Sequence, residues 1–262
     1  MAARSNGKSG NADETGGLRA MILAAGRGER LRPLTDTTPK PLVVVGGKPL
    51  IEYALDSVQR AGIDEVVINL HHLGEQIRAH VGDGSRFGVR VHYSQEDILQ
   101  DTGGGIRDAR RYLDGSTFVT MNSDTIVDVD LTEIVRVHRA SGAIATMLLR
   151  KDPRMESFGI IETESDGRVG RFLGRARQGM QAPLEPWMYT GVQVLEPAVF
   201  RYLDYEGPFS ITKLSYPAML DAGEKITGLP FDGAWITVGT PAELEQAAKR
   251  IGAMQKRSLD NA

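Results

Sequence analysis

Residues 24–40 read AAGRGERLRPLTDTTPK, and they directly follow the short apolar run AMIL at residues 20–23. An apolar run of this length predicts a buried strand of a parallel sheet. Ligands of such sheets bind beyond the carboxyl ends of the strands, so this segment begins where a functional site is expected. The two elements together favour an α/β fold whose site lies at that edge of the sheet.

The residue types of this segment are those of a phosphate-binding loop. Gly26 and Gly28 let the backbone turn sharply and bring N–H groups close to an anion. Cationic side chains outnumber acidic ones, with Arg27, Arg30, Arg32 and Lys40 against Glu29 and Asp36. We therefore predict a loop that collects negative charge.

The spacing in this segment excludes two common phosphate-binding loops. The G-x-x-x-x-G-K-[ST] pattern is absent, and the G-x-G-x-x-G pattern fails because Leu31 stands in place of the third glycine. Pro33 would also disrupt a helix begun at the glycines. With Pro39 and Pro41 on either side, Lys40 is expected in a non-helical segment. The prediction is an extended loop punctuated by prolines.

The composition of the chain limits its class of function. With 262 residues and 41% hydrophobic residues, it has ample material for the core of one α/β domain. A formal net charge of −3 argues against broad nucleic-acid binding. The absence of cysteine excludes disulfides, thiolate metal ligands and a cysteine nucleophile. No apolar run approaches the roughly 18 residues of a membrane span, and residues 1–17 lack a signal-peptide core, so we expect a cytoplasmic protein without a membrane partner.

Helical and strand patterns alternate along the chain, as in a doubly wound, mostly parallel, Rossmann-like three-layer sandwich. We expect a disordered leader at 1–17, a single domain at 18–252 and a polar tail at 253–262. Further strands are expected at 66–70, 89–93, 117–121, 143–149 and 187–195, and a small antiparallel sheet at 158–162 and 168–173. Helices are expected at 49–61, 73–81, 106–113, 131–140, 197–203, 211–222 and 241–255.

Residues 24–42 follow the pattern AAGxGxRLxPxT and then PKPL, which resembles the signature of the sugar-1-phosphate nucleotidylyltransferases, or NDP-sugar pyrophosphorylases. The TGGG at 102–105 is most similar to short bacterial members that act on N-acetylmuramate 1-phosphate, or on mannose or heptose 1-phosphate. The resemblance implies a nucleotide-diphospho-sugar transferase fold. It also implies transfer of a nucleotidyl group from a nucleoside triphosphate to a sugar 1-phosphate, with release of pyrophosphate.

The resemblance assigns the catalytic and metal-binding roles. Arg30 is expected to bind the triphosphate and the leaving pyrophosphate, and Lys40 the α-phosphate and the transition state. Asp124 follows a predicted strand at the same edge and matches the metal-binding aspartate of the family. Mg²⁺ is the implied cofactor, with Mn²⁺ as an alternative.

Two loops are expected to bind the nucleotide. The first contributes Ala24, Ala25, Gly26 and Gly28, and the second contributes Glu96, Gly103 and Gly104. The glycines at 103–105 predict a flexible turn that opens a helix, where a planar base could lie against bare backbone. By position, Glu96 matches the acidic residue near the base. A carboxylate there can accept N1–H and N2–H of guanine or N3–H of uracil, so GTP and UTP both stay open.

Sugar contacts are expected from Asn122, Gly159, Thr190 and Gly191, which match sugar-binding positions of the family. Relatives often carry E-K-P in this region, and its acid meets sugar hydroxyls. This chain has LGR at 173–175 instead. Arg175 or Arg177 could therefore favour an acidic or phosphate-bearing sugar, or could be ordinary surface arginines.

The sharpest departure lies in GAWITVGTP at 233–241, which is similar to the closing W-x-D-[VI]-G-T-P motif of the family. The second metal-binding aspartate would fall at Thr237. A hydroxyl can ligate Mg²⁺ but brings no charge. A non-catalytic sugar-nucleotide-binding or regulatory homologue therefore stays as an alternative to the transferase, and a nicotinamide-dependent oxidoreductase as a third. A monomer or small homo-oligomer is expected.

Overall fold

Four parallel strands form the centre of the protein in the computed structural model, which describes residues 17–260 and their side chains as far as Met254. β1 (Arg19–Leu23) lies between β4 (Glu65–Leu70) and β6 (Phe118–Asn122). β5 (Arg90–Gln95) pairs with the far side of β4. The predicted parallel strands are thus confirmed.

The sheet continues beyond β6 with antiparallel pairing. β12 (Glu185–Leu195) runs antiparallel to both β6 and β8 (Ala145–Arg150), so β6 and β8 point the same way. β13 (Ile226–Pro230) is parallel to β8. The predicted small antiparallel sheet forms the outer end of the same ten-stranded sheet, from β9 (Ile160–Thr163), β10 (Val169–Phe172) and β11 (Arg175–Ala176). The parallel strands therefore end at one common edge.

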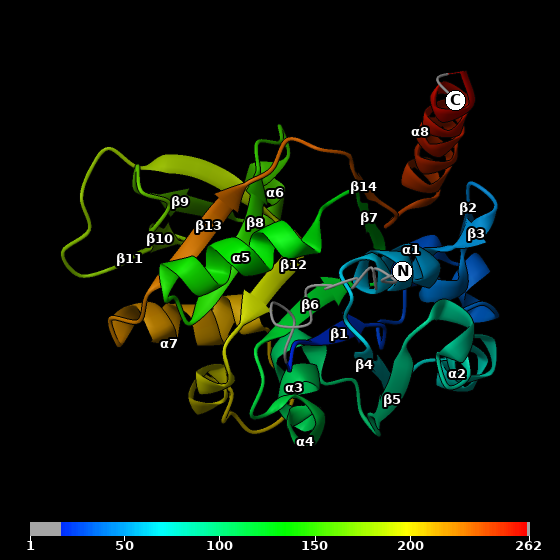
Figure 1. Ribbon diagram of the computed structural model, residues 1–262, viewed down its shortest axis with the longest axis horizontal. Helices are drawn as coiled ribbons and strands as arrows, with labels where there is room; N and C mark the ends of the chain where they lie inside the picture. The colour runs from blue at the N-terminus through cyan, green and yellow to red at the C-terminus, as the bar shows by residue number, and fades with distance from the viewer. Residues whose placement is uncertain (1–16, 261–262) are drawn as a thin grey trace, which may run out of the picture.

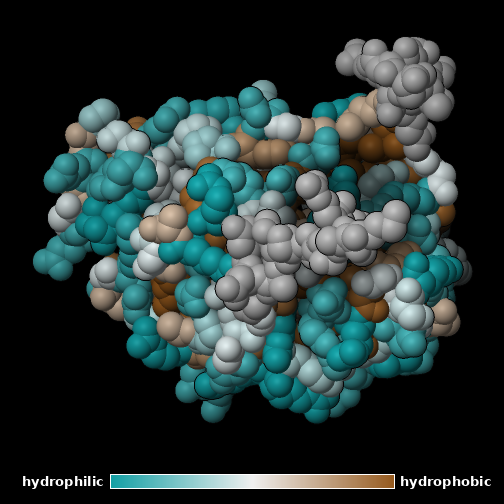
Figure 2. Space-filling view, in the orientation of Figure 1, coloured by the Kyte–Doolittle hydropathy of each residue, from teal (hydrophilic) through white to brown (hydrophobic). Residues whose placement is uncertain are grey.

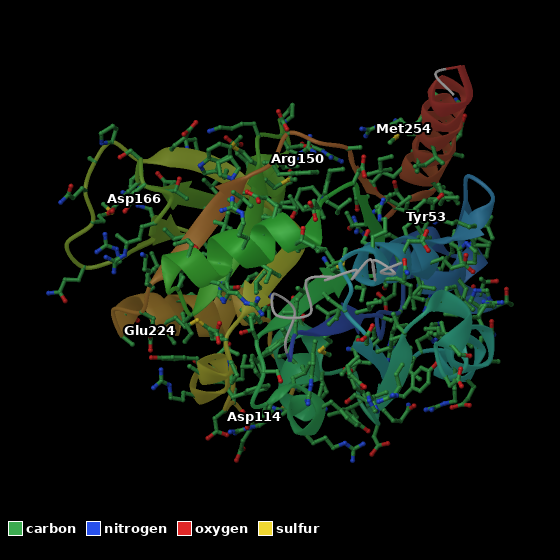
Figure 3. The ribbon with its side chains drawn as sticks, in the orientation of Figure 1. Tyr53, Asp114, Arg150, Asp166, Glu224 and Met254 are labelled. Atoms are coloured by element: carbon green, nitrogen blue, oxygen red, sulfur yellow. The ribbon has the colours of Figure 1, made fainter. Side chains whose placement is uncertain are left out.

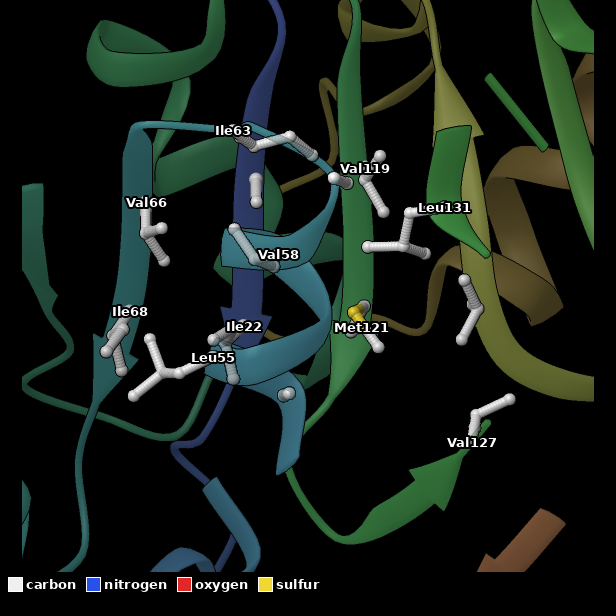
Figure 4. Close-up of a cluster of buried hydrophobic side chains, with 14 of the residues drawn as sticks. Ile22, Leu55, Val58, Ile63, Val66, Ile68, Val119, Met121, Val127 and Leu131 are labelled. Atoms are coloured by element: carbon white, nitrogen blue, oxygen red, sulfur yellow. The ribbon is translucent and has the colours of Figure 1, made fainter. Parts of the chain in front are cut away.

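Helices cover both faces of this sheet (Figure 1). Alternate residues of β1 point to opposite faces, and Ile22 joins the core under α1 (Leu50–Arg60) and α5 (Leu131–Ser141). Met21 joins the other core, under α3 (Asp101–Asp108) and α7 (Tyr216–Asp221). Figure 4 shows the first core, where Leu55 and Val58 of α1 pack over the strands. Burying each such side chain contributes about 1.5–3 kcal/mol, so packing on both faces of the sheet stabilises the fold.

The remaining elements are short, apart from the last helix. They are the strands β2 (Val44–Val45), β3 (Lys48–Pro49), β7 (Thr125–Val127) and β14 (Trp235–Thr237), the helices α2 (Gly74–Val81), α4 (Arg110–Leu113), α6 (Met155–Phe158) and α8 (Pro241–Asp260), the 3-10 turns η4 (Ser85–Phe87) and η5 (Pro197–Tyr202), and the π-helical turn η6 (Ile211–Ser215). Tyr53 of α1 and Met254 of α8 line one groove at the same end of the molecule (Figure 3).

The surface seen in Figure 2 is mostly hydrophilic, with a hydrophobic area beside the base of α8. None of the helices within residues 17–260 is both long and apolar enough to cross a membrane.

The loop that follows β1, residues 24–42, contains helical turns and is not extended, so this part of the sequence prediction was wrong. Three 3-10 turns occupy it: η1 (Glu29–Leu31), η2 (Leu34–Asp36) and η3 (Lys40–Leu42). Lys40 begins η3 although Pro41 follows it. A proline in the first turn of a helix sacrifices no hydrogen bond, because the N–H groups there have no partner within the helix.

The glycines at 103–105 were also placed wrongly, because α3 already begins at Asp101 and contains all of them. They permit close packing rather than a turn. A Cβ on Gly103 would lie 2.2 Å from Phe209, and one on Gly105 would lie 2.8 Å from the Asn69 side chain. The helix can approach these neighbours only because side chains are missing there.

The structure describes little of the two predicted ends of the chain. α8 runs to Asp260, five residues past the predicted end at 255, so the expected polar tail begins inside a helix. The predicted leader lies outside the described residues, except for Gly17.

His138 of α5 is a buried titratable group, with 1% of its surface exposed. Its Nδ1 lies 2.8 Å from the Thr146 hydroxyl, and its Nε2 lies 2.9 Å from a Glu196 carboxylate oxygen. Burial lowers the pKa of the imidazole below its ordinary value, and this effect outweighs the opposite effect of Glu196.

We expect the free energy of unfolding to fall as the pH drops below about 6.5, the pKa of an unfolded histidine. Below that pH the unfolded chain takes up a proton that folded His138 resists. Urea unfolding between pH 7.5 and 5.5 measures this loss. His138→Gln has no titrating ring and should lose stability less steeply over this range; an equal slope in both proteins would contradict the expectation.

Candidate active site

A cleft of about 480 Å³ opens at the carboxyl ends of β1, β4 and β6. The end of β1 and the first loop contribute small apolar groups, from Leu23 to Gly26. Asn122, Ser123 and Asp124 follow from the end of β6. The predicted residues Ala24, Ala25, Gly26, Lys40, Asn122 and Asp124 all line this cleft. The edge chosen from the sequence is therefore where the cavity lies.

A second cavity of about 370 Å³ adjoins the cleft and is strongly cationic. Arg27, Gly28, Glu29 and Arg30 line it together with Gly239. Lys40 and Leu99 line both cavities, so the two spaces share a wall. An elongated anion could lie across both.

Lys40 and Asp124 are in direct contact where the two cavities meet. The Nζ of Lys40 lies 2.5 Å from Oδ2 of Asp124, and the Thr125 hydroxyl donates to Oδ1 of Asp124 at 3.1 Å. The main chain of Asp124 is held as well, because its carbonyl accepts the Val238 N–H at 3.1 Å. The lysine and the carboxylate are thus fixed from separate parts of the chain.

Arg30 reaches the second cavity past Gly239. A Cβ on Gly239 would lie 2.6 Å from an Arg30 guanidinium nitrogen and 2.9 Å from a Glu243 oxygen. That glycine therefore leaves room for the guanidinium beside the start of α8. Thr237 lies opposite Thr125 in the pairing of β14 with β7, next to Asp124 in the chain, and its role as a metal ligand stays a prediction.

The residues predicted to bind the base lie behind the cleft wall in the part of the chain that the structure describes. Glu96 is buried and accepts hydrogen bonds from the Asn69 amide at 2.7 Å and the Gln100 N–H at 2.9 Å. Burial raises the pKa of its carboxyl. Asn69 in turn accepts the Ala24 N–H at 2.7 Å. Glu96 therefore holds the first loop through Asn69, and Gly103 faces Phe209.

The predicted sugar contacts are divided between the cleft and the scaffold. Gly191, at φ +91°, leaves room for the Asn122 side chain, since a Cβ on Gly191 would lie 2.6 Å from the Asn122 amide nitrogen. The Thr190 hydroxyl donates to the Leu148 carbonyl at 2.9 Å, inside the core. Gly159, at φ +95°, packs against Leu173. Asn122 is thus the one of the four that lines the cleft among the described residues.

Arg175 and Arg177 are both paired with carboxylates of the same chain. Arg175 binds Asp221, and Arg177 binds Glu164 at 2.5 Å. Glu164 also accepts the Gln181 N–H at 2.8 Å. These contacts favour the structural interpretation of the two arginines over a role in sugar recognition.

Several residues of the cleft wall were not predicted: Asn69, Leu99, Asp101, Thr102, Ser123 and Pro208. Asn69 could have been singled out from the sequence, because it is the polar residue in the apolar strand run VVINL at 66–70. Pro208 could not, since it reaches the wall through its neighbour Phe209, whose carbonyl accepts the Gly103 N–H at 2.9 Å.

Residues 19–253 match the model of the nucleotidyl transferase family. The chain belongs to this family. The resemblance stated from the sequence motifs is therefore confirmed, and with it the Rossmann-like α/β fold.

Three relatives illustrate the similarity. N-acetylmuramate alpha-1-phosphate uridylyltransferase of Neisseria meningitidis is 37% identical, over 90% of this chain and 99% of its own length. UTP–glucose-1-phosphate uridylyltransferase of Synechocystis is 31% identical over 89% of this chain. Mannose-1-phosphate guanylyltransferase of Mycobacterium tuberculosis is 31% identical over 86% of this chain. The chain spans 63% and 62% of the length of the last two.

Solved structures share the fold of this nucleotidyl transferase. HddC of Yersinia pseudotuberculosis, complexed with GMP-PN, superposes with a TM-score of 0.71 at 21% identity. The match covers 88% of this chain and 98% of HddC.

Glu96→Gln tests the structural role of Glu96 in this nucleotidyl transferase. The amide would turn an N–H group towards either Asn69 or Gln100, and Asn69 cannot flip because its oxygen serves Ala24. We expect a loss of about 1–3 kcal/mol in the free energy of unfolding by urea at pH 7. Glu75→Gln on the exposed face of α2 is the control, expected within about 0.5 kcal/mol of the parent. Unchanged stability together with altered nucleotide discrimination would instead make Glu96 a base contact.

Proposed function

We propose that this chain transfers a nucleotidyl group from a nucleoside triphosphate to a sugar 1-phosphate, releasing pyrophosphate. The observation that carries the proposal is the position of Lys40, in contact with Asp124 and on the wall between the cleft and the Arg30 cavity. A nucleotide lying with its nucleoside in the cleft and its β- and γ-phosphates beside Arg30 would bring its α-phosphate to Lys40.

The reaction is a substitution at the α-phosphorus. An oxygen of the sugar 1-phosphate forms a bond to this phosphorus, and the bond to the oxygen bridging to the β-phosphate breaks with its electrons leaving on pyrophosphate. The attacking oxygen is already anionic at neutral pH, so no strong general base is required. Catalysis then depends on bringing two anions together and stabilising the charge of the transition state. Lys40 serves the α-phosphate, and Arg30 serves the leaving pyrophosphate.

The donor set in the cleft is compatible with Mg²⁺. Asp124 offers one carboxylate, and residues 17–260 contain no group of three or more His, Asp or Glu side chains arranged for a metal. Mg²⁺ is usually bound by one or two carboxylates together with substrate phosphates, rather than by an all-protein cage. Asp124 would hold the ion, with Thr237 as a further candidate, and the ion would reduce the repulsion between the phosphates. Mn²⁺ could serve in its place.

The substrates are proposed by class. The names of the relatives include uridylyltransferases and a guanylyltransferase, which supports UTP or GTP as the nucleotide, and all of them name a sugar 1-phosphate. Because nucleoside triphosphates are cytoplasmic metabolites, we place the reaction in the cytoplasm. No observation favours the non-catalytic alternative.

An array of UTP, GTP, CTP, ATP and dTTP against several sugar 1-phosphates tests the proposal. We expect pyrophosphate release with at least one pair in the presence of Mg²⁺. If the protein binds a sugar nucleotide but no pair of nucleoside triphosphate and sugar 1-phosphate releases pyrophosphate, with Mg²⁺ or Mn²⁺, the proposed reaction is refuted.

Lys40→Ala is expected to lower kcat by about 100-fold to 1,000-fold, because it removes a preorganised charge at the reacting phosphate. Lys48→Ala is the matched control. Lys48 pairs with Asp56 away from both cavities, so the kcat of this variant should stay near that of the parent. A near-normal kcat for Lys40→Ala would remove Lys40 from the catalytic role.

Gly239→Ala is expected to displace Arg30 without unfolding the protein. The new methyl group would press on the ends of two flexible side chains, Arg30 and Glu243, rather than on the main chain. We expect kcat/KM for the nucleotide to fall about 10-fold, as when one charge-assisted contact is lost. Gly252→Ala in α8 meets no atom within 4 Å and is the control. Equal kcat/KM in both variants would show that the place of Arg30 beside Gly239 is immaterial.

A further inference from the structure

One wall of the cleft follows β5, and the groups there that could read a base are few. Glu96, the acidic residue expected near the base, turns both carboxylate oxygens to Asn69 and Gln100. Asn69 lines the cleft, and its side chain is held in place because its oxygen accepts the Ala24 N–H and one of its two amide N–H groups binds Glu96. The other polar groups of this wall are therefore candidates for reading a nucleobase.

Asp101 is the carboxylate that this wall presents to the cleft. It is exposed, it lines the cavity, and it begins α3. Its Oδ1 accepts the Thr102 N–H at 2.6 Å, whereas its Oδ2 has no hydrogen-bond partner within the described residues. One oxygen thus orients the side chain and the other remains available to a ligand.

The backbone holds Asp101 firmly in an unusual conformation. Its φ is +59°, in the left-handed region that side chains other than Asn and Asp seldom adopt. The segment after Pro208 buttresses it on both sides. The Phe209 N–H donates to the Gln100 carbonyl at 3.1 Å, and the Ile211 N–H donates to the Thr102 hydroxyl at 3.1 Å. The position of the carboxylate is therefore set before any ligand binds.

The neighbouring groups suit a flat ring. Leu99 and Pro208 share the wall with Asp101, and the side of the cleft at the end of β1 consists of Leu23, Ala24, Ala25 and Gly26. Apolar surfaces with a small number of placed polar groups are the usual construction of a small-molecule pocket. The charged pair Lys40–Asp124 comes from other loops, after β1 and β6, so Asp101 contributes a separate carboxylate to the same cleft.

We propose that Asp101 selects the base of the nucleotide by accepting a hydrogen bond from a ring N–H. An ionised carboxylate can only accept hydrogen bonds. Uracil presents N3–H and guanine presents N1–H on the edge that is read, whereas cytosine and adenine present a ring lone pair at the corresponding atom. A carboxylate facing that atom attracts the first two bases and repels the others. This inference rests on the proposed function and deepens it.

Asp101→Asn is the most direct variant, because asparagine tolerates the same φ and its amide can both donate and accept. Steady-state kinetics with UTP, GTP, CTP and ATP are measured with one sugar 1-phosphate that supports turnover. The parent is expected to prefer UTP or GTP over CTP and ATP by about 100-fold in kcat/KM, and the variant to lose about 10-fold to 100-fold of that preference. The separate UTP and GTP assays distinguish the two bases.

Asp101→Gly is a second variant, which keeps the positive φ and removes the carboxylate, and it should lose the same preference. Asp97→Asn, exposed and four residues earlier, is the control and should keep the parental selectivity. Parental preference for CTP or ATP, or an unchanged ratio in both Asp101 variants, would overturn the inference.

Calorimetric binding of the four nucleotides separates this inference from the proposed function. Selective binding that depends on Asp101 but without pyrophosphate release would refute the reaction and leave the base-reading role intact. Pyrophosphate release with a base preference independent of Asp101 would do the reverse.

Discussion

The contact between Lys40 and Asp124 is the constraint on which the site depends. Lys40 is only 9% exposed, and a buried ammonium group destabilises a fold unless an anion accompanies it. Asp124 supplies the anion from the end of β6, at 2.5 Å. The pair therefore holds a cation and a carboxylate at one point of the cleft without a large net charge. In the reaction proposed above, an entering phosphate would exchange partners with this pair instead of meeting an isolated charge.

The rest of the fold sets where this pair lies. β1 and β6 are neighbours in the sheet, so their loops leave the same edge side by side. The carbonyl of Asp124 is tied to Val238 beyond β14, and the start of the first loop is tied through Ala24 to Asn69 and then Glu96. Residues that are far apart in the sequence thus hold the loops of the cleft in position. These contacts explain how a site built on loops can be preorganised.

The sequence predicted the parts of this arrangement that follow from local rules. An apolar strand followed by a Gly-rich cationic loop led to Ala24, Ala25, Gly26 and Lys40, and a carboxylate after another strand led to Asp124. Contacts between segments that are distant in the sequence could not be predicted from local rules. The glycines at 103–105 predict a turn, because the sequence does not show that Phe209 packs against Gly103. The sequence does not show that Glu96 accepts hydrogen bonds from Asn69 and Gln100, and its role at the base stays a prediction. Asp101 is recognised only from its backbone angle and its position in the cleft.

A crystal structure of the protein with a non-hydrolysable UTP or GTP analogue would show whether the triphosphate lies across the two cavities. We expect the α-phosphate within hydrogen-bonding distance of the Lys40 ammonium group, and the β- and γ-phosphates beside Arg30 in the adjoining cavity. A triphosphate bound elsewhere, or an α-phosphate out of reach of Lys40 while Lys40 stays paired with Asp124, would refute this arrangement.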